Sequence, residues 1–125
     1  MALRVLVVDD SAVMRSMVVK VLNMTGLPIV EIREAENGKA GLDALEAGGI
    51  DLALVDINMP VMDGLTMLEN VRANPKFCSL PVVVVSTEGS DKRIKELKAR
   101  GAAFIRKPFA PEALVDAVVS AIGGG

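Results

Sequence analysis

The feature that most constrains the fold is an alternation of short apolar runs with helical segments, repeated five times along the chain. Helical segments between such runs predict parallel strands, and right-handed crossovers then bring the carboxyl ends of all the strands to one edge of a sheet. The apolar runs are Val5–Val8, Ile29–Ala35, Leu52–Val55, Pro81–Val85 and Ala102–Ile105. The predicted helices are Ser11–Met24, Asn37–Gly48, Leu65–Ala73, a polar helix that begins at Ser90 or Asp91, and Pro111–Ile122.

This pattern predicts an α/β fold of the doubly wound (βα)5 kind, with one parallel five-stranded sheet. The continuous apolar run Val82–Val85 is typical of a strand buried on both faces. The alternation of apolar and charged residues in Ile29–Ala35 is typical of an edge strand. A length of 125 residues suits one domain with its own core, so we expect residues 1–125 to form one domain.

The composition argues against several classes of function. A net charge of −2 and the absence of Trp and Tyr disfavour nucleic-acid binding. The absence of histidine excludes any mechanism in which this chain supplies a histidine base, ligand or phosphocarrier. Cys78 is alone, and we expect it to be a reduced, small apolar filler. No apolar run is long enough to span a membrane, so we expect a cytoplasmic protein without membrane insertion.

Four of the five predicted strands lead into polar residues that suit phosphoryl chemistry. They are Asp9 and Asp10 after the first strand, Asp56 after the third, Ser86 after the fourth and Lys107 after the fifth. Each has an ordinary alternative when taken alone. The first two aspartates and Ser86 can cap helices, Asp56 can start a turn, and Lys107 can be a solvated loop lysine.

The combination of these residues is more informative than any one of them. Three carboxylates at one edge repel one another unless a cation lies among them. Mg²⁺ accepts carboxylate oxygens and keeps waters that a phosphate can replace, and the backbone carbonyl of Asn58 can join the carboxylates as a ligand. A mobile charge on Lys107 and a hydroxyl on Ser86 suit the oxygens of a phosphoryl group. The pattern indicates a magnesium-dependent phosphoryl site.

The same residues resemble the receiver domain of two-component response regulators. The matching motifs are DD after the first strand, D-x-N-M-P-x-M-D-G after the third, S-T-E after the fourth and K-P-F after the fifth. The resemblance covers Leu3 to Ile122, and only glycines follow, which is similar to a stand-alone CheY-like chemotaxis receiver without an output domain. It implies a flavodoxin-like strand order of 2-1-3-4-5 and a cis peptide between Lys107 and Pro108.

The resemblance also implies a role for each residue of the site. Asp56 would accept a phosphoryl group from a phosphohistidine on a partner histidine kinase, with Ser86 and Lys107 as catalytic residues that bind the group. The implied Mg²⁺ ligands are Asp9, Asp10, Asp56 and the carbonyl of Asn58. We expect a signalling protein, not an enzyme with a separate substrate.

Other residues bear on the switch and on the phosphoryl lifetime. Ser86 and Phe104 are the implied switch residues, but Phe104 stands where many receivers carry Tyr, and core packing is its alternative role. Thr87 stands where receivers often have a small residue such as Ala, and we expect it to narrow access to the site. Asn58 and Glu88 flank the site, where polar side chains can orient an attacking water, so we predict a short-lived phosphoryl state.

Half of the 14 basic residues lie between Lys92 and Lys107. A solvated helix face is one explanation of this run. The functional alternative is an output face made of the fourth helix, fifth strand and fifth helix, which would suit an acidic segment of a downstream protein target or motor component. The fourth helix has few apolar anchors, so we predict that it shifts readily, and we expect the protein to be a monomer.

Three other functions compete with this hypothesis. A receiver-like scaffold that never takes phosphate conflicts with the intact set of site residues. A phosphatase with an aspartyl intermediate usually has a second aspartate two residues after the nucleophile, where this chain has Asn58. A flavin carrier conflicts with Asp9 and Asp10, which would repel the flavin phosphate, and with the absence of Trp and Tyr.

Overall fold

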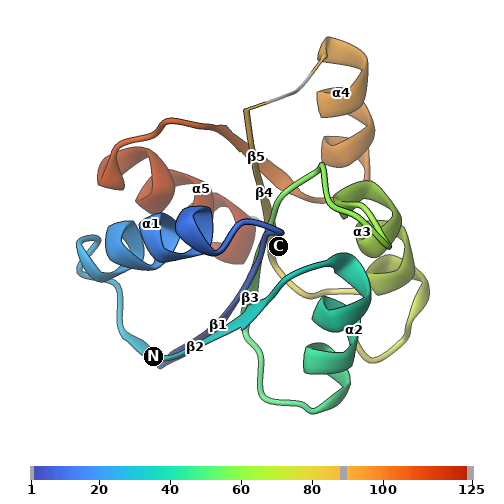
Figure 1. Cartoon of the computed structure of the whole chain (residues 1–125), viewed down its shortest axis with the longest axis horizontal. Coiled ribbons are helices and arrows are strands. Elements are labelled where there is room, and N and C mark those ends of the chain that lie inside the picture. The colour runs from blue at the N-terminus through green and yellow to red at the C-terminus, as the bar shows by residue number, and fades with distance from the viewer. Residues whose placement is uncertain (1, 88–89, 124–125) are drawn as a thin grey trace.

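Strands and helices alternate along the whole of the computed structural model, which describes residues 2–87 and 90–123 (Figure 1). The strands are β1 (Leu3–Val8), β2 (Ile29–Ala35), β3 (Leu52–Val55), β4 (Val82–Ser86) and β5 (Ala103–Arg106). The helices are α1 (Ala12–Asn23), α2 (Gly38–Glu46), α3 (Gly64–Ala73), α4 (Asp91–Ala99) and α5 (Pro111–Gly123). The element bounds agree closely with the sequence prediction, and β4 extends to include Ser86.

All neighbouring strands are parallel, and their order is β2-β1-β3-β4-β5. This confirms the predicted doubly wound fold and the strand order that the family resemblance implied. β2 lies at an edge of the sheet, as its alternating sequence predicted. β1 and β3 are neighbours, so the residues that follow them emerge side by side.

Helices cover both faces of the sheet (Figure 1). On one face, α1 and α5 contribute Val18, Leu22, Leu114 and Val118 to a buried cluster with one set of strand side chains. On the other face, α2, α3 and α4 contribute Leu45, Met67, Leu68, Val71 and Leu97 to a second cluster. Full burial of each such side chain stabilises the folded state by roughly 1.5–3 kcal/mol. The two helix layers together fix the position of the sheet and of the residues that follow its strands. None of the described helices combines the length and apolarity needed to cross a membrane.

Side-chain caps fix the start of the helices that follow the sheet edge. The Ser11 hydroxyl accepts a hydrogen bond from the Met14 N–H at 3.2 Å, and the Ser90 hydroxyl accepts one from the Arg93 N–H at 3.1 Å. Each cap contributes about 1 kcal/mol. Because Ser11 caps α1, neither Asp9 nor Asp10 is needed for that purpose.

Gly64 lets α3 begin directly against the end of β3. A Cβ atom at this position would lie 2.2 Å from the carbonyl oxygen of Asp56, which no real side chain tolerates. The Gly64 N–H donates to the carbonyl of Ile57 at 2.8 Å. Only glycine permits this close approach, and the contact fixes the backbone of Asp56 at the edge of the sheet.

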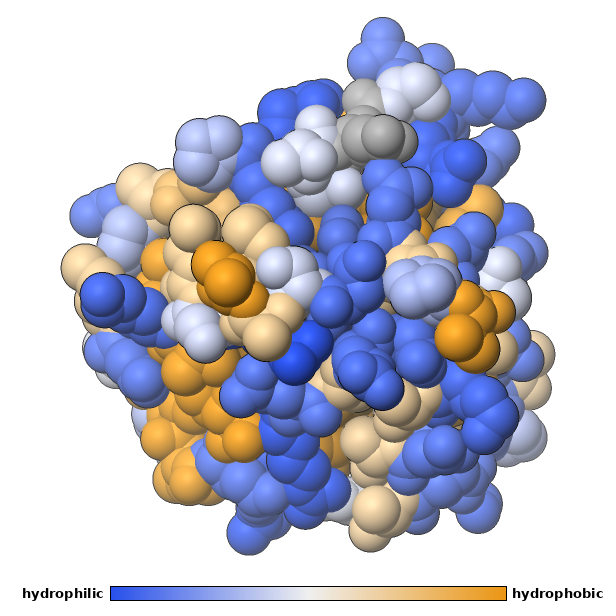
Figure 2. Space-filling view, in the orientation of Figure 1, coloured by the Kyte–Doolittle hydropathy of each residue, from blue (hydrophilic) through white to orange (hydrophobic). Residues whose placement is uncertain are grey.

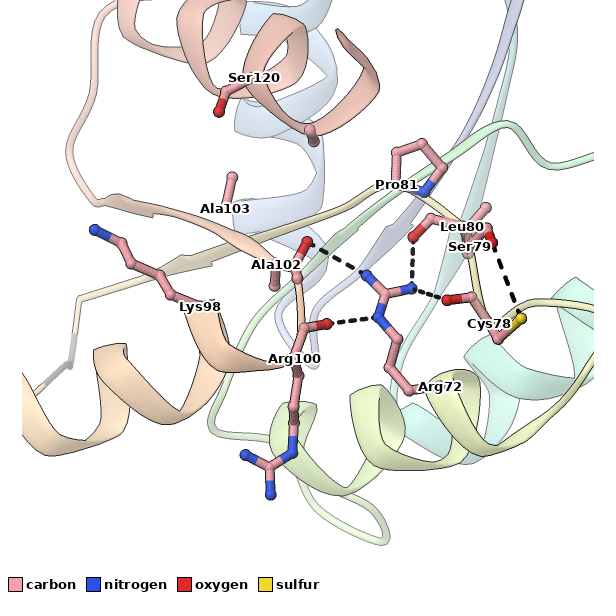
Figure 3. A pocket seen from close by; sticks show the side chains of 12 residues that line it. Arg72, Cys78, Ser79, Leu80, Pro81, Lys98, Arg100, Ala102, Ala103 and Ser120 are labelled. Atoms are coloured by element: carbon pink, nitrogen blue, oxygen red, sulfur yellow. Dashed lines mark hydrogen bonds between the residues drawn. The ribbon is translucent and has the colours of Figure 1, made fainter. Parts of the chain in front are cut away.

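Arg72 connects three segments at the amino ends of β4 and β5, opposite the carboxyl ends of the strands (Figure 3). Its Nε donates to the Arg100 carbonyl at 2.6 Å, and its Nη1 donates to the Leu80 carbonyl at 2.7 Å and to the Cys78 carbonyl at 3.3 Å. Burial lowers the pKa of Arg72 from its ordinary value. The guanidinium therefore acts as a structural clamp between α3, the loop before β4 and the turn before β5.

The prediction for Cys78 was wrong. We expected a small apolar filler, but Cys78 is exposed and lines a cavity of about 520 Å³ beside Arg72 (Figure 3). The inward contacts of its loop are made by Phe77 and Leu80, which pack against the core on either side of it.

Candidate functional site

Three carboxylates converge at the carboxyl edge of the sheet. The N–H of Asp56 donates to the Val8 carbonyl at 2.9 Å, which aligns the end of β3 with the end of β1. One oxygen from each of Asp9, Asp10 and Asp56 lies within 4.8 Å of the other two. The structure thus brings together the three aspartates that the sequence singled out.

Lys107 lies among these carboxylates. Its Nζ is 2.9 Å from Oδ2 of Asp9 and 3.8 Å from Oδ2 of Asp56, and only 7% of its side chain is exposed. Its N–H donates to the Ser86 carbonyl at 3.0 Å, and the peptide bond to Pro108 is cis, as predicted. Lys107 is therefore not a solvated loop lysine.

Ser86 is the last residue of β4 and is 1% exposed, and the following helix α4 is capped by Ser90 instead. Its side chain acts on the Asp56 carboxylate and lowers the pKa of that group. The Ile57 N–H donates to Oδ1 of the same carboxylate at 2.8 Å. The carboxylate of Asp56 thus has the Ile57 N–H at Oδ1 and the Lys107 ammonium near Oδ2.

The charge balance of the site opposes ionisation of Asp56. Burial is the largest influence and raises the pKa of Asp56, and the nearby Asp9 carboxylate raises it further. Lys107 and the hydrogen bonds from Ser86 and Ile57 lower it, but the net direction is upward. An ionised Asp56 would therefore be stabilised by additional positive charge at this edge.

The donor set fits a hard divalent cation. Three aspartates and one lysine carry a formal charge of −2, and an ion of charge +2 would neutralise it. Carboxylate oxygens are ligands that Mg²⁺ prefers, and the exposed side of Asp10 leaves room for water ligands. Among the residues that the structure describes, this is the group of acidic side chains that lie close enough together to hold a metal ion.

The remaining predicted residues lie around this centre. Asn58 is exposed on the loop that follows Asp56, and Thr87 is exposed just after β4. Glu88 lies outside the described residues. The roles assigned to Asn58 and Glu88 in phosphoryl loss stay predictions.

Phe104 is half-buried on β5 and packs against the core cluster that contains Leu97 of α4. The Arg106 guanidinium carbon lies 5.8 Å from the centre of its ring. The structure thus shows the packing role that was the alternative for Phe104. Its role as a switch stays a prediction.

Sequence reasoning missed two residues near the site. Arg15 on α1 donates from Nη1 to the carbonyl of Asp9 at 2.6 Å and from Nε to Glu34 at 3.0 Å. Val61, on the loop after Asp56, has a φ of 67°, which is strained for a β-branched residue. No local motif marks either residue, because the contacts of Arg15 are set by tertiary packing and a backbone angle leaves no sequence pattern.

Comparison with known proteins agrees with this geometry. The model of the response regulator receiver domain matches residues 5–119. A chemotaxis protein CheY homolog from Campylobacter jejuni is 35% identical over 125 residues, which is 98% of this chain and 95% of the relative. The chemotaxis response regulator CheY4 of Vibrio cholerae has a similar structure, with a TM-score of 0.82, 33% identity, and coverage of 97% of this chain and 99% of that one.

A putative response regulator from Chloroflexus aurantiacus is also similar in structure. Its TM-score is 0.87 at 27% identity, with coverage of 98% of this chain and 99% of that one. The match to the family model spans most of the chain, from β1 to α5, and includes Asp9, Asp56, Ser86 and Lys107. The sequence match, the strand order and the clustered aspartates agree, and the chain belongs to the response regulator receiver domain family.

Proposed function

We propose that this protein is switched on by a phosphoryl group carried on Asp56. The observation that supports this most strongly is the position of Asp56, which lies between two further carboxylates, a buried lysine and a buried serine. Each of these groups has a use in phosphoryl transfer. Two of the relatives are named as chemotaxis proteins, so we place the switch in two-component signalling of the chemotaxis type.

The donor in this proposal is a phosphohistidine on a partner histidine kinase, because this chain contains no histidine. A carboxylate oxygen of Asp56 forms a bond to phosphorus while the P–N bond breaks, and the imidazole leaves with that electron pair and takes up a proton. Lys107 pairs with a phosphoryl oxygen. Its Nζ already lies 3.8 Å from Oδ2 of Asp56, so this pairing needs little movement of the side chain. The Ser86 hydroxyl donates to another phosphoryl oxygen.

Asp9, Asp10, Asp56 and the carbonyl of Asn58 would hold Mg²⁺. When bound, the ion supplies positive charge that offsets the negative charge of the phosphoryl oxygens. Two observations support the fit of this ion to the site. The three carboxylates converge, and the pKa of Asp56 is raised because burial disfavours its charge more than Lys107 favours it.

The phosphoryl group leaves by hydrolysis in this proposal. A water oxygen bonds to phosphorus, the O–P bond to Asp56 breaks, and inorganic phosphate departs with the carboxylate restored. Asn58 and Glu88 would orient that water, which predicts a short lifetime. Exposure of Asn58 two residues after Asp56 is consistent with access to such a water.

The signal would leave through the face formed by α4, β5 and α5. Hydrophilic side chains cover the part of the molecule where α4 lies (Figure 2). A groove of about 790 Å³ runs between these elements and is lined by Phe104, Lys98 and Arg106, among others. Two cationic side chains, Lys98 and Arg106, line this groove beside Phe104 and outnumber the one acidic side chain there, Asp116, which suits an acidic segment of a downstream protein, such as a motor component.

Leu97 is the buried residue of α4, and Ile94 is only half-buried. A helix held by so few apolar contacts has a low free energy of local displacement. Phosphorylation would bias the position of α4, with Ser86 and Phe104 linking the site to the output face. We propose that the chain acts in this way as one monomeric receiver unit.

Beryllofluoride, which mimics a phosphoryl group on a carboxylate, tests the proposal. Titration with Mg²⁺ present should change the backbone NMR spectrum of the wild-type chain around Asp56 and along α4. Asp56→Asn should abolish the change, whereas the control Asp43→Asn, on the exposed surface of α2, should retain it. A wild-type spectrum that does not respond would refute the proposed function.

A further inference from the structure

We propose that Arg15 is a positioning residue, which holds the Asp9–Asp10 peptide so that both carboxylates face one metal ion. The inference rests on the proposed magnesium site and assigns a role to a residue that does not itself touch the ion. Arg15 lies on α1, one turn after the two aspartates.

The contacts of Arg15 are well defined. Its Nη1 donates to the carbonyl oxygen of Asp9 at 2.6 Å, which is short for a charge-assisted hydrogen bond. Its Nε donates to Oε1 of Glu34, near the end of β2, at 3.0 Å. Only 17% of the Arg15 side chain is exposed, so the guanidinium is fixed between α1, β1 and β2.

Asp9 has other restraints besides Arg15. Its N–H donates to the Ala35 carbonyl at 3.0 Å, its Oδ1 accepts from the Ser11 N–H at 3.0 Å, and its Oδ2 accepts from Lys107 at 2.9 Å. Three hydrogen bonds therefore hold Asp9, one at its backbone N–H and two at its carboxylate.

Asp10 has no such restraint. Its side chain is exposed and, within residues 2–87 and 90–123, takes part in no hydrogen bond or ion pair. Its direction is set by the backbone. The carbonyl that Arg15 binds belongs to the planar peptide joining Asp9 to Asp10, so fixing that oxygen fixes the plane from which the Asp10 side chain departs.

A purely electrostatic role would have the opposite consequence. The guanidinium is a positive charge beside a cation site, so removing that charge would by itself tighten Mg²⁺ binding. Removing a positioning contact weakens it, because Asp10 would then have to be ordered when the ion binds. The sign of the change therefore distinguishes the two roles.

The experiment is isothermal titration of the full chain with MgCl₂, comparing wild type, Arg15→Lys and Arg15→Gln. Lysine keeps the charge but lacks the planar guanidinium, so it cannot donate to the Asp9 carbonyl and to the Glu34 carboxylate in the way that arginine does. We expect both variants to lower Mg²⁺ affinity by roughly 10-fold, the size of effect typical of groups that orient metal ligands. Circular dichroism establishes that each variant is folded.

Arg33→Lys is a matched control. Arg33 also joins a β2 glutamate, Glu31, to a backbone carbonyl, that of Gly48. These contacts lie towards the amino ends of the strands, whereas Arg15 lies at their carboxyl ends. Its replacement should leave Mg²⁺ affinity unchanged. Any general effect of losing an arginine fork would appear in this variant as well.

The outcomes separate the two proposals. If the wild-type chain takes up Mg²⁺ and Arg15→Lys binds it equally well, or if Arg15→Gln binds it more tightly, the positioning role is overturned while the metal site stands. If the wild-type chain takes up no Mg²⁺, the proposed metal site is overturned together with this inference.

Discussion

Replacement of Asp56 by asparagine should stabilise the protein in the absence of divalent ions. Asp56→Asn removes a buried negative charge and keeps an oxygen that can accept from Ser86 and from the Ile57 N–H. The expected gain at neutral pH follows from the charges around this side chain, of which 12% is exposed.

The magnitude comes from three main contributions, because solvent screens the repulsion from the exposed Asp10. The Lys107 Nζ at 3.8 Å attracts the ionised Asp56 by about 4 kcal/mol at an effective dielectric constant of about 20. An Asp9 oxygen within 4.8 Å repels it by at least about 3 kcal/mol on the same basis. Loss of water adds several kcal/mol, so the charge is unfavourable on balance, and the asparagine variant should gain about 1–2 kcal/mol.

The pH dependence follows from the raised pKa of Asp56. A carboxyl group whose pKa is higher in the folded state contributes stability at low pH and loses it as the pH rises through that folded-state pKa. The gain from asparagine should therefore be full at pH values above the folded-state pKa. It should shrink as the pH falls towards 3.8, the ordinary pKa of aspartate, because the wild-type carboxyl is then protonated as well.

Urea unfolding followed by circular dichroism is the assay, because the chain has no Trp or Tyr for fluorescence. EDTA in every sample keeps divalent ions from the site. Asp43→Asn is the control, since Asp43 pairs with Lys39 at 72% exposure and its loss should change stability by less than about 0.5 kcal/mol. The free energy of unfolding is compared at neutral pH and near pH 3.8. A lower stability of Asp56→Asn than of wild type, or a gain in stability that is equal at these two pH values, would refute the reasoning.

Two further substitutions test other parts of the structure in the same assay. Arg72→Met should cost about 3 kcal/mol, because it leaves the carbonyls of Leu80 and Arg100 without their donor, and a loss below about 1 kcal/mol would contradict the clamp. Val61→Asn should stabilise by about 1 kcal/mol, because asparagine tolerates a φ of 67° better than a β-branched residue does. If Val61→Asn is less stable than wild type, the side chain of Val61 stabilises the fold by more than its backbone strain costs.

Much of the fold could be predicted because parallel strands buried on both faces leave a clear record in sequence. The run Val82–Val85 is entirely apolar, and each of its residues is buried in β4. The alternating Ile29–Ala35 forms the edge strand β2, whose residues other than Ala35 are only partly buried or are exposed. The cluster of Asp9, Asp10 and Asp56 could be foreseen because parallel strands deliver their carboxyl ends to one edge.

The rest depended on contacts between residues far apart in the chain. Arg15 binds a backbone carbonyl and Glu34, and Arg72 binds carbonyls of two distant loops, so no local pattern marks either arginine. Cys78 was misplaced because apolar character alone does not say which side of a loop faces the core. The strained backbone of Val61 is likewise invisible in a sequence that otherwise follows the motif.

Mass spectrometry after treatment with acetyl phosphate tests the central claim most directly. With Mg²⁺ present, we predict that the wild-type chain gains about 80 Da, that peptide mapping after chemical trapping places the group on Asp56, and that EDTA prevents the gain. Absence of the adduct in the presence of Mg²⁺, or its location on a residue other than Asp56, would contradict the account.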